Sequence, residues 1–116
     1  MDELTTLSGK KFRYKGEISE ELIVYPSDKG NKHQDKFALV ITPYTTNIVM
    51  SAIRREREIL MGASRDNPPP KSLGALLKKE RQTPQQLSYL VPILIQRRLC
   101  DSTKEGNSFV VRYKGR

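Results

Sequence analysis

The sequence predicts an α+β fold in which a β-rich N-terminal extension is followed by three helices and a C-terminal β-hairpin. Hydrophobic residues spaced three and four apart, with capping residues at the starts of these segments, predict the helices. Alternating apolar and polar residues near the C-terminus predict the hairpin. A chain of 116 residues has room for one domain, or for a small domain with an extension, and we place the boundary between residues 43 and 44.

The N-terminal extension is predicted to contain three strands and one mobile loop. Residues 1–9 show no periodicity and are expected to be a frayed terminus. Strand-like runs cover residues 11–15, 21–25 and 37–42, and the first of them alternates basic with aromatic side chains. Residues 26–36 are polar and rich in turn-forming types, which predicts the loop. We therefore expect a small antiparallel sheet, or an extension packed on the helices.

The first helix is predicted to run from Asn47 to about Met61. Thr45 or Thr46 can cap its start, and Gly62 lies near its end. A charged stretch in its second half interrupts the apolar positions. Because the charges in that stretch alternate in sign, we expect them to form a solvated face.

The second helix is predicted from Ser72 to Lys79, after a loop at residues 64–70 that contains three consecutive prolines. Three leucines recur at helical spacing, and Ser72 is a plausible N-cap. Two lysines at the C-terminal end interact favourably with the helix dipole. Residues 80–82 then form a turn of the length that usually joins the two helices of a helix-turn-helix unit.

The third helix is predicted to open at Thr83, where three features support a helix start. Thr83 can act as N-cap, Pro84 occupies the first helical position, and Gln86 can complete a capping box. Apolar residues then recur at intervals of four and three. Pro92 removes a backbone hydrogen bond from the helix interior at a cost of about 3 kcal/mol, so we expect a kink or a division near Leu90.

The C-terminal hairpin is predicted from two strand-like runs, residues 99–102 and 108–113, on either side of a turn. The turn, residues 103–107, contains the glycine and asparagine that hairpins favour. Cys100 lies where the third helix meets the first of these strands, a position suited to a small buried side chain.

Residues 88–100 resemble the second helix of winged helix-turn-helix regulators, whose pattern in letters is roughly S-x-x-L-x-x-L-x-x-x-G-L. Four positions match: Ser88, Val91, Leu94 and Leu99. The family's glycine, which ends the helix in a left-handed conformation, is replaced by Arg98. The resemblance implies a winged helix at residues 45–114. It also implies a DNA-binding protein, a transcriptional regulator, that places the helix from Thr83 in the major groove.

The same resemblance implies which residues would contact DNA. Base edges would be read by Gln85, Ser88 and Tyr89, with glutamine suited to adenine. The phosphate backbone would be held by seven further residues: Lys71, Lys78, Lys79, Arg81, Thr83, Lys104 and Arg112. Two alternatives stay open at this stage, because Tyr89 could pack under the wing and Gln85 could be ordinary helix surface.

The distribution of charge supports a polyanionic partner. Residues 1–43 hold seven Lys or Arg and seven Asp or Glu, whereas residues 44–116 hold fourteen against six. The whole net charge of +8 therefore belongs to the second segment, and double-stranded DNA is the expected partner. The alternatives are a protein-interaction module that uses the N-terminal strand edges, binding of RNA or single-stranded DNA by residues 11–15, and a basic face that only maintains solubility.

Enzymatic activity, cofactors and metal sites are not expected. His33 has no second histidine or nearby cysteine, and Asp28, Asp35 and Lys36 only superficially resemble a nuclease cluster. No phosphate-binding glycine loop or serine elbow is present. No apolar run approaches 18 residues, and the single cysteine fits a reducing compartment. We expect a cytoplasmic or nucleoid-associated protein that could form a homodimer on a two-fold operator.

Overall fold

The computed structural model describes residues 2–26, 38–63 and 67–115. Its elements follow in chain order: β1 (Asp2–Thr5), β2 (Lys11–Gly16), β3 (Leu22–Pro26), β4 (Leu39–Ile41), α1 (Pro43–Glu56), β5 (Glu58–Leu60), α2 (Leu73–Lys79), the 3-10 helix η2 (Pro84–Gln86), α3 (Leu87–Gln96), β6 (Cys100–Glu105) and β7 (Ser108–Tyr113). The predicted α+β class is confirmed, with an N-terminal sheet, three α-helices and a C-terminal hairpin. That order is compatible with a winged helix.

The N-terminal sheet is antiparallel, with strand order β1-β2-β3-β4. Alternation along β2 directs Phe12 and Tyr14 into the core, where each is at most 1% exposed. Its basic side chains face solvent. The aromatic residues of this strand are therefore not available to stack on single-stranded bases.

The frayed terminus predicted for residues 1–9 is wrong for residues 2–5. Residues 2–5 form β1, in which Glu3 pairs with Arg13 and Leu4 pairs with Phe12 of β2. A short polar run carries no periodic hydrophobic signal. The unpaired edge of β2 supplies the hydrogen bonds that fix it as a strand.

The first helix starts earlier and ends earlier than the sequence predicts. Thr42, rather than Thr45 or Thr46, is the N-cap, and its hydroxyl accepts a hydrogen bond from the Thr45 amide. The predicted helical segment at residues 58–60 is instead strand β5, which joins the C-terminal hairpin to give the strand order β5-β7-β6. Pairing with β7 overrides the helical periodicity there.

The second helix is confirmed together with its cap. The Ser72 hydroxyl accepts a hydrogen bond from the Ala75 amide at 3.1 Å and donates one to the Pro69 carbonyl at 2.6 Å. Gly74 lies against Gly62, and a Cβ atom at Gly74 would come within 1.6 Å of the Gly62 carbonyl oxygen. Gly62, Pro68 and Pro69 are therefore packed closely on the start of α2.

The third helix begins differently from the prediction. Thr83 makes no side-chain capping bond, and a single 3-10 turn precedes α3. The break in the helix thus falls at Leu87 rather than at Leu90, and α3 continues through Pro92. Thr83 is held in an extended conformation because it precedes a proline, which sets the entry angle before the α-helix can form.

Both α2 and α3 end in the hydrogen-bond pattern of a Schellman motif with an arginine in the left-handed conformation. After α3, the Arg98 amide donates to Ile95 and the Leu99 amide donates to Leu94. Arg98 has φ 61° and therefore adopts the left-handed conformation that the glycine of the winged-helix pattern would take. After α2, Arg81 plays the same part with φ 62°.

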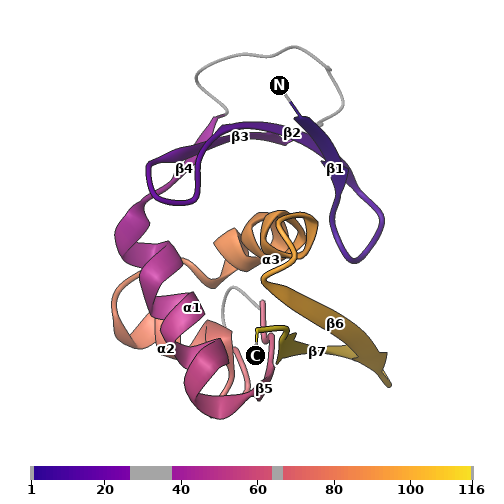
Figure 1. Ribbon diagram of the computed structural model, residues 1–116. Helices are drawn as coiled ribbons and strands as arrows, with labels where there is room; N and C mark the ends of the chain where they lie inside the picture. The colour runs from indigo at the N-terminus through magenta and orange to yellow at the C-terminus, as the bar shows by residue number, and fades with distance from the viewer. Residues whose placement is uncertain (1, 27–37, 64–66, 116) are drawn as a thin grey trace.

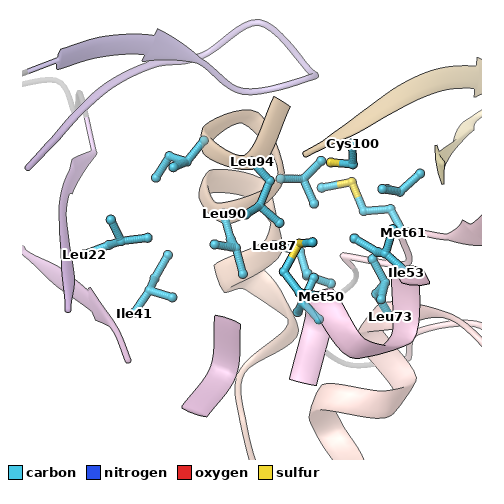
Figure 2. Close-up of a cluster of buried hydrophobic side chains, with 14 of the residues drawn as sticks. Leu22, Ile41, Met50, Ile53, Met61, Leu73, Leu87, Leu90, Leu94 and Cys100 are labelled. Carbon is cyan, nitrogen blue, oxygen red and sulfur yellow. The ribbon is translucent and has the colours of Figure 1, made fainter. Parts of the chain in front are cut away.

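Helix α3 lies between the arched N-terminal sheet and the hairpin β6–β7 (Figure 1). Figure 2 shows Leu90 and Leu94 of α3 between Leu22 and Ile41 of the sheet and the side chains of α1. All these side chains belong to one hydrophobic cluster, which the two sequence segments share. Within the described ranges, no helix is long and apolar enough to cross a membrane.

Candidate nucleic-acid interface

The ten residues predicted to contact DNA fall into three separate groups in the structure. The first surrounds α2, the second lines a cleft beneath the N-terminal sheet, and the third lies on the C-terminal hairpin. Their members are, respectively, Lys71, Lys78, Lys79 and Arg81; Thr83, Gln85, Ser88 and Tyr89; and Lys104 and Arg112. Each group has a different exposure and charge environment.

The end of α2 and the turn that follows it present basic side chains, and hydrogen bonds hold this turn in place. Lys78, Lys79 and Arg81 are all exposed. The turn is tied to α1 by two side-chain hydrogen bonds, Tyr44 to Glu80 at 2.9 Å and Thr45 to Gln82 at 3.0 Å. The hydrogen bond to Glu80 raises the pKa of Tyr44 above its usual value, because the phenol proton is held by the carboxylate.

Strained backbone positions coincide with positive charge. The described residues with a left-handed backbone, other than glycines, are four basic residues: Arg57, Lys71, Arg81 and Arg98. This conformation costs an ordinary side chain roughly 1–2 kcal/mol, whereas glycine adopts it freely. A cation at a helix C-terminus gains only about 0.3–1 kcal/mol from the dipole. The dipole alone therefore does not offset the strain at Arg57, Arg81 and Arg98, and it does not act at Lys71, which precedes α2. All four positions are candidates for a functional role.

The second group lies at a cleft of about 370 Å³ between the β1–β2 turn and the start of α3. Thr83 and Gln85 are exposed, but Ser88 and Tyr89 are only partly so. The Tyr89 ring contacts Phe12 edge-on, with centroids 5.2 Å apart and an interplanar angle of 78°. Tyr89 thus packs under the N-terminal sheet rather than under the wing, and the sheet covers the middle of the helix.

The C-terminal end of α3 is also fastened to the N-terminal sheet. The Tyr14 hydroxyl donates a hydrogen bond to Gln96, and Arg97 forms an ion pair with Glu17 at 3.0 Å. Arg97 also donates a hydrogen bond to the Tyr14 hydroxyl at 3.4 Å, and this bond is the main cause of the raised pKa of Arg97. Helix α3 is therefore held against the sheet along its length.

The hairpin offers one available cation and one that is already paired. Lys104 is exposed next to the Gly106-Asn107 turn and forms no ion pair among the described residues. Arg112 contacts Glu58 of β5 at 2.6 Å, and both side chains are about half exposed. A phosphate would have to compete with that carboxylate for Arg112. Of the two predicted hairpin residues, Lys104 is the better placed for a polyanion.

The sequence did not single out the arginines near the C-terminal end of α1 as site residues. Arg55 is exposed and lines a groove with Lys71 and Lys79. Its alternation with glutamates indicated only a solvated face, and the approach of α2 could not be read from that pattern. The groove forms only where α2 lies next to the end of α1, and this tertiary arrangement has no local sequence signal.

The described residues contain no group of three or more His, Cys, Asp or Glu side chains that could hold a metal ion. Cys100 is buried, as predicted, and burial raises the pKa of its thiol to about 12. His33, Asp28, Asp35 and Lys36 lie outside the described residues, as does most of the predicted loop 26–36.

No family model, curated protein or solved structure matches this chain.

Proposed function

We propose that the chain is a winged-helix protein that binds double-stranded DNA mainly through its phosphate backbone. The single observation that carries the proposal is the charge asymmetry: the whole net charge of +8 belongs to residues 44–116. Exposed cations of that segment surround the turn between its second and third helices. Neutralisation of phosphates by such side chains releases counterions and drives affinity.

The burial of α3 limits how this protein can read sequence. Ser88 and Tyr89 face the N-terminal sheet, so insertion of the middle of the helix into the major groove would require the sheet to leave. Thr83 lies just before the 3-10 turn and Gln85 lies within it. Both residues are exposed, so they remain able to approach base edges. We therefore propose shallow contact by this turn, with backbone contacts from Lys78, Arg81 and the hairpin.

The test is a fluorescence-anisotropy titration with random duplex DNA, single-stranded DNA and duplex RNA at several salt concentrations. Arg81→Ala and Lys104→Ala should each weaken duplex DNA binding on all sequences and lower the salt slope by about 1. Lys15→Ala, on the outer face of the N-terminal sheet, is the matched control and should leave binding unchanged. Gln85→Ala should relax any sequence preference at one position without a large loss of affinity.

Equal loss of affinity in the Lys15 control would indicate non-specific attraction to the whole protein. The absence of duplex DNA binding at low salt would remove the DNA proposal. A protein-interaction module would then be the better hypothesis. The N-terminal sheet covers one face of α3, which already favours a structural role for this helix over insertion into a DNA groove. Co-purification of a stoichiometric partner, with no DNA retained at moderate salt, would support that second function.

A further inference from the structure

A groove of about 500 Å³ lies between the C-terminal end of α1, strand β5 and helix α2. Its floor is apolar and partly exposed, formed by Ile59 of β5 and by Ala75 and Leu76 of α2. Its rim carries three exposed cations, Arg55, Lys71 and Lys79. An apolar floor with a basic rim differs from the polar cleft beneath the N-terminal sheet.

The acidic groups close to this groove already have partners. Glu56, the acidic residue lining it, contacts Arg55 at 3.0 Å, and both side chains are about half exposed or more, so solvent screens the pair strongly. Glu58, at the start of β5, contacts Arg112 at 2.6 Å. Within the described ranges Lys71 and Lys79 form no ion pair. The rim therefore keeps net positive charge that the protein itself does not neutralise.

Lys71 adds a backbone observation to the electrostatic one. It adopts φ 64°, a conformation that glycine takes without strain, yet the chain places an exposed lysine there. Lys71 precedes the N-cap Ser72 at the start of α2, so the favourable interaction of cations with helix C-termini cannot explain it. Strain that is kept at a charged, exposed position points to a use for that charge.

We propose that this groove docks an acidic peptide segment of a partner protein. An aliphatic side chain of the segment covers Leu76 and Ile59, while flanking carboxylates meet Lys71 and Lys79. A phosphodiester chain would satisfy the rim but has no aliphatic group to remove the floor from water, which favours a peptide. The proposal goes beyond DNA binding and does not depend on it.

The experiment is a display selection of short random peptides on the full-length protein, followed by anisotropy measurements on the enriched sequences. We expect enriched peptides to combine Asp or Glu with Leu, Ile or Val. Lys71→Glu/Lys79→Glu should weaken their binding by about tenfold or more, since it places like charges opposite the carboxylates. The charge-matched control Lys15→Glu/Lys104→Glu should leave peptide binding within about twofold, because neither residue lines the groove.

A second variant tests the floor. Ala75→Gln keeps a good helix former and leaves the rim charges in place, so it should weaken peptide binding without changing its salt dependence. Enrichment of peptides without acidic residues, equal effects of the two charge variants, or no enrichment would overturn the proposal. A groove variant that lowers duplex DNA affinity while peptides fail to bind would assign the groove to phosphates instead. Loss of the DNA proposal alone would leave these outcomes unaffected.

Discussion

At the scale of single residues, the left-handed arginines at helix ends connect stability with the proposed function. Arg81 and Arg98 both occupy the position after the helix C-cap that glycine normally takes. Each residue keeps the capping hydrogen bonds, so the motif forms in spite of the side chain. The sequence departs from the winged-helix pattern at Arg98, but the backbone at Arg98 still takes the left-handed conformation.

Arg81→Gly should raise stability and lower DNA affinity together. Relief of the left-handed strain outweighs the loss of the favourable dipole interaction, so we expect a gain of about 0.5–1 kcal/mol in the free energy of unfolding. Urea denaturation measures the gain, and anisotropy measures the weaker binding. Arg54→Gly, inside α1, should lose roughly 1 kcal/mol instead. A loss of stability in Arg81→Gly would contradict the account of the strain.

Cys100 should make the stability of the protein fall at alkaline pH. Burial raises the pKa of the folded thiol from 9.0 to about 12, so the folded state holds this proton more tightly than the unfolded state does. The stabilising contribution is complete below about pH 9 and is lost between pH 9 and 12, at a rate on the order of 1 kcal/mol per pH unit. Comparison with Cys100→Ala in urea at pH 8 and pH 10.5 isolates it. Identical pH slopes for the two proteins would refute the assignment.

At the scale of secondary-structure elements, α3 is the element that both sheets bury. Its leucines belong to the common core, and Tyr89 is packed on Phe12 of β2. The sequence predicted one apolar stripe on this helix, as expected for a recognition helix with a free opposite face. The N-terminal sheet occupies that opposite face. The helix is therefore a structural centre of the fold, and under the proposed function the exposed elements next to it contact the DNA.

Tyr89→Ala should reduce stability rather than sequence preference. Loss of the edge-on ring contact and of the buried area should lower the free energy of unfolding by about 2 kcal/mol. Gln85→Ala should change the free energy of unfolding by less than about 0.5 kcal/mol, because the Gln85 side chain is exposed. Denaturation curves combined with binding to a panel of duplexes separate the two effects. A stable Tyr89→Ala protein with altered preference would return α3 to the interface.

At the scale of the whole molecule, the hydrophobic cluster joins the two segments that the charge distribution separates. Phe12, Tyr14 and Leu22 pack in the same cluster as the helices of residues 44–116. Removal of the N-terminal sheet would expose apolar side chains of α3 to water. The extension is thus an energetic part of the fold, whatever boundary the composition marks.

The fragment of residues 44–116 should therefore fail to unfold cooperatively by itself. Thermal melts followed by circular dichroism should show a sharp transition for the full chain and a broad one for the fragment. Addition of a synthetic peptide of residues 1–43 should restore part of the transition. A fragment with a full cooperative transition would show that residues 44–116 form an independent domain.

Local patterns predicted most of the elements correctly. The Ser72 cap, the α2 periodicity and the β6–β7 hairpin depend on interactions between residues a few positions apart, which a sequence displays directly. The misplaced helix starts, at Thr42 and Thr83, are local errors of a few residues, whereas the two errors of strand assignment involve distant partners. Strand β1 forms by pairing with the edge of β2. Strand β5 forms by pairing with β7, which is why the predicted helix at residues 58–60 is wrong.

The sequence by itself determined the α+β class, the three helices, the hairpin, the buried cysteine and the concentration of positive charge in residues 44–116. Only the tertiary structure decided that α3 lies between two sheets, that Arg112 is paired with Glu58, and that Arg55 joins Lys71 and Lys79 around one groove. Periodicity and capping are local properties. Which face of a helix stays free depends on which distant segment covers it, and no spacing of residues along the chain carries that information.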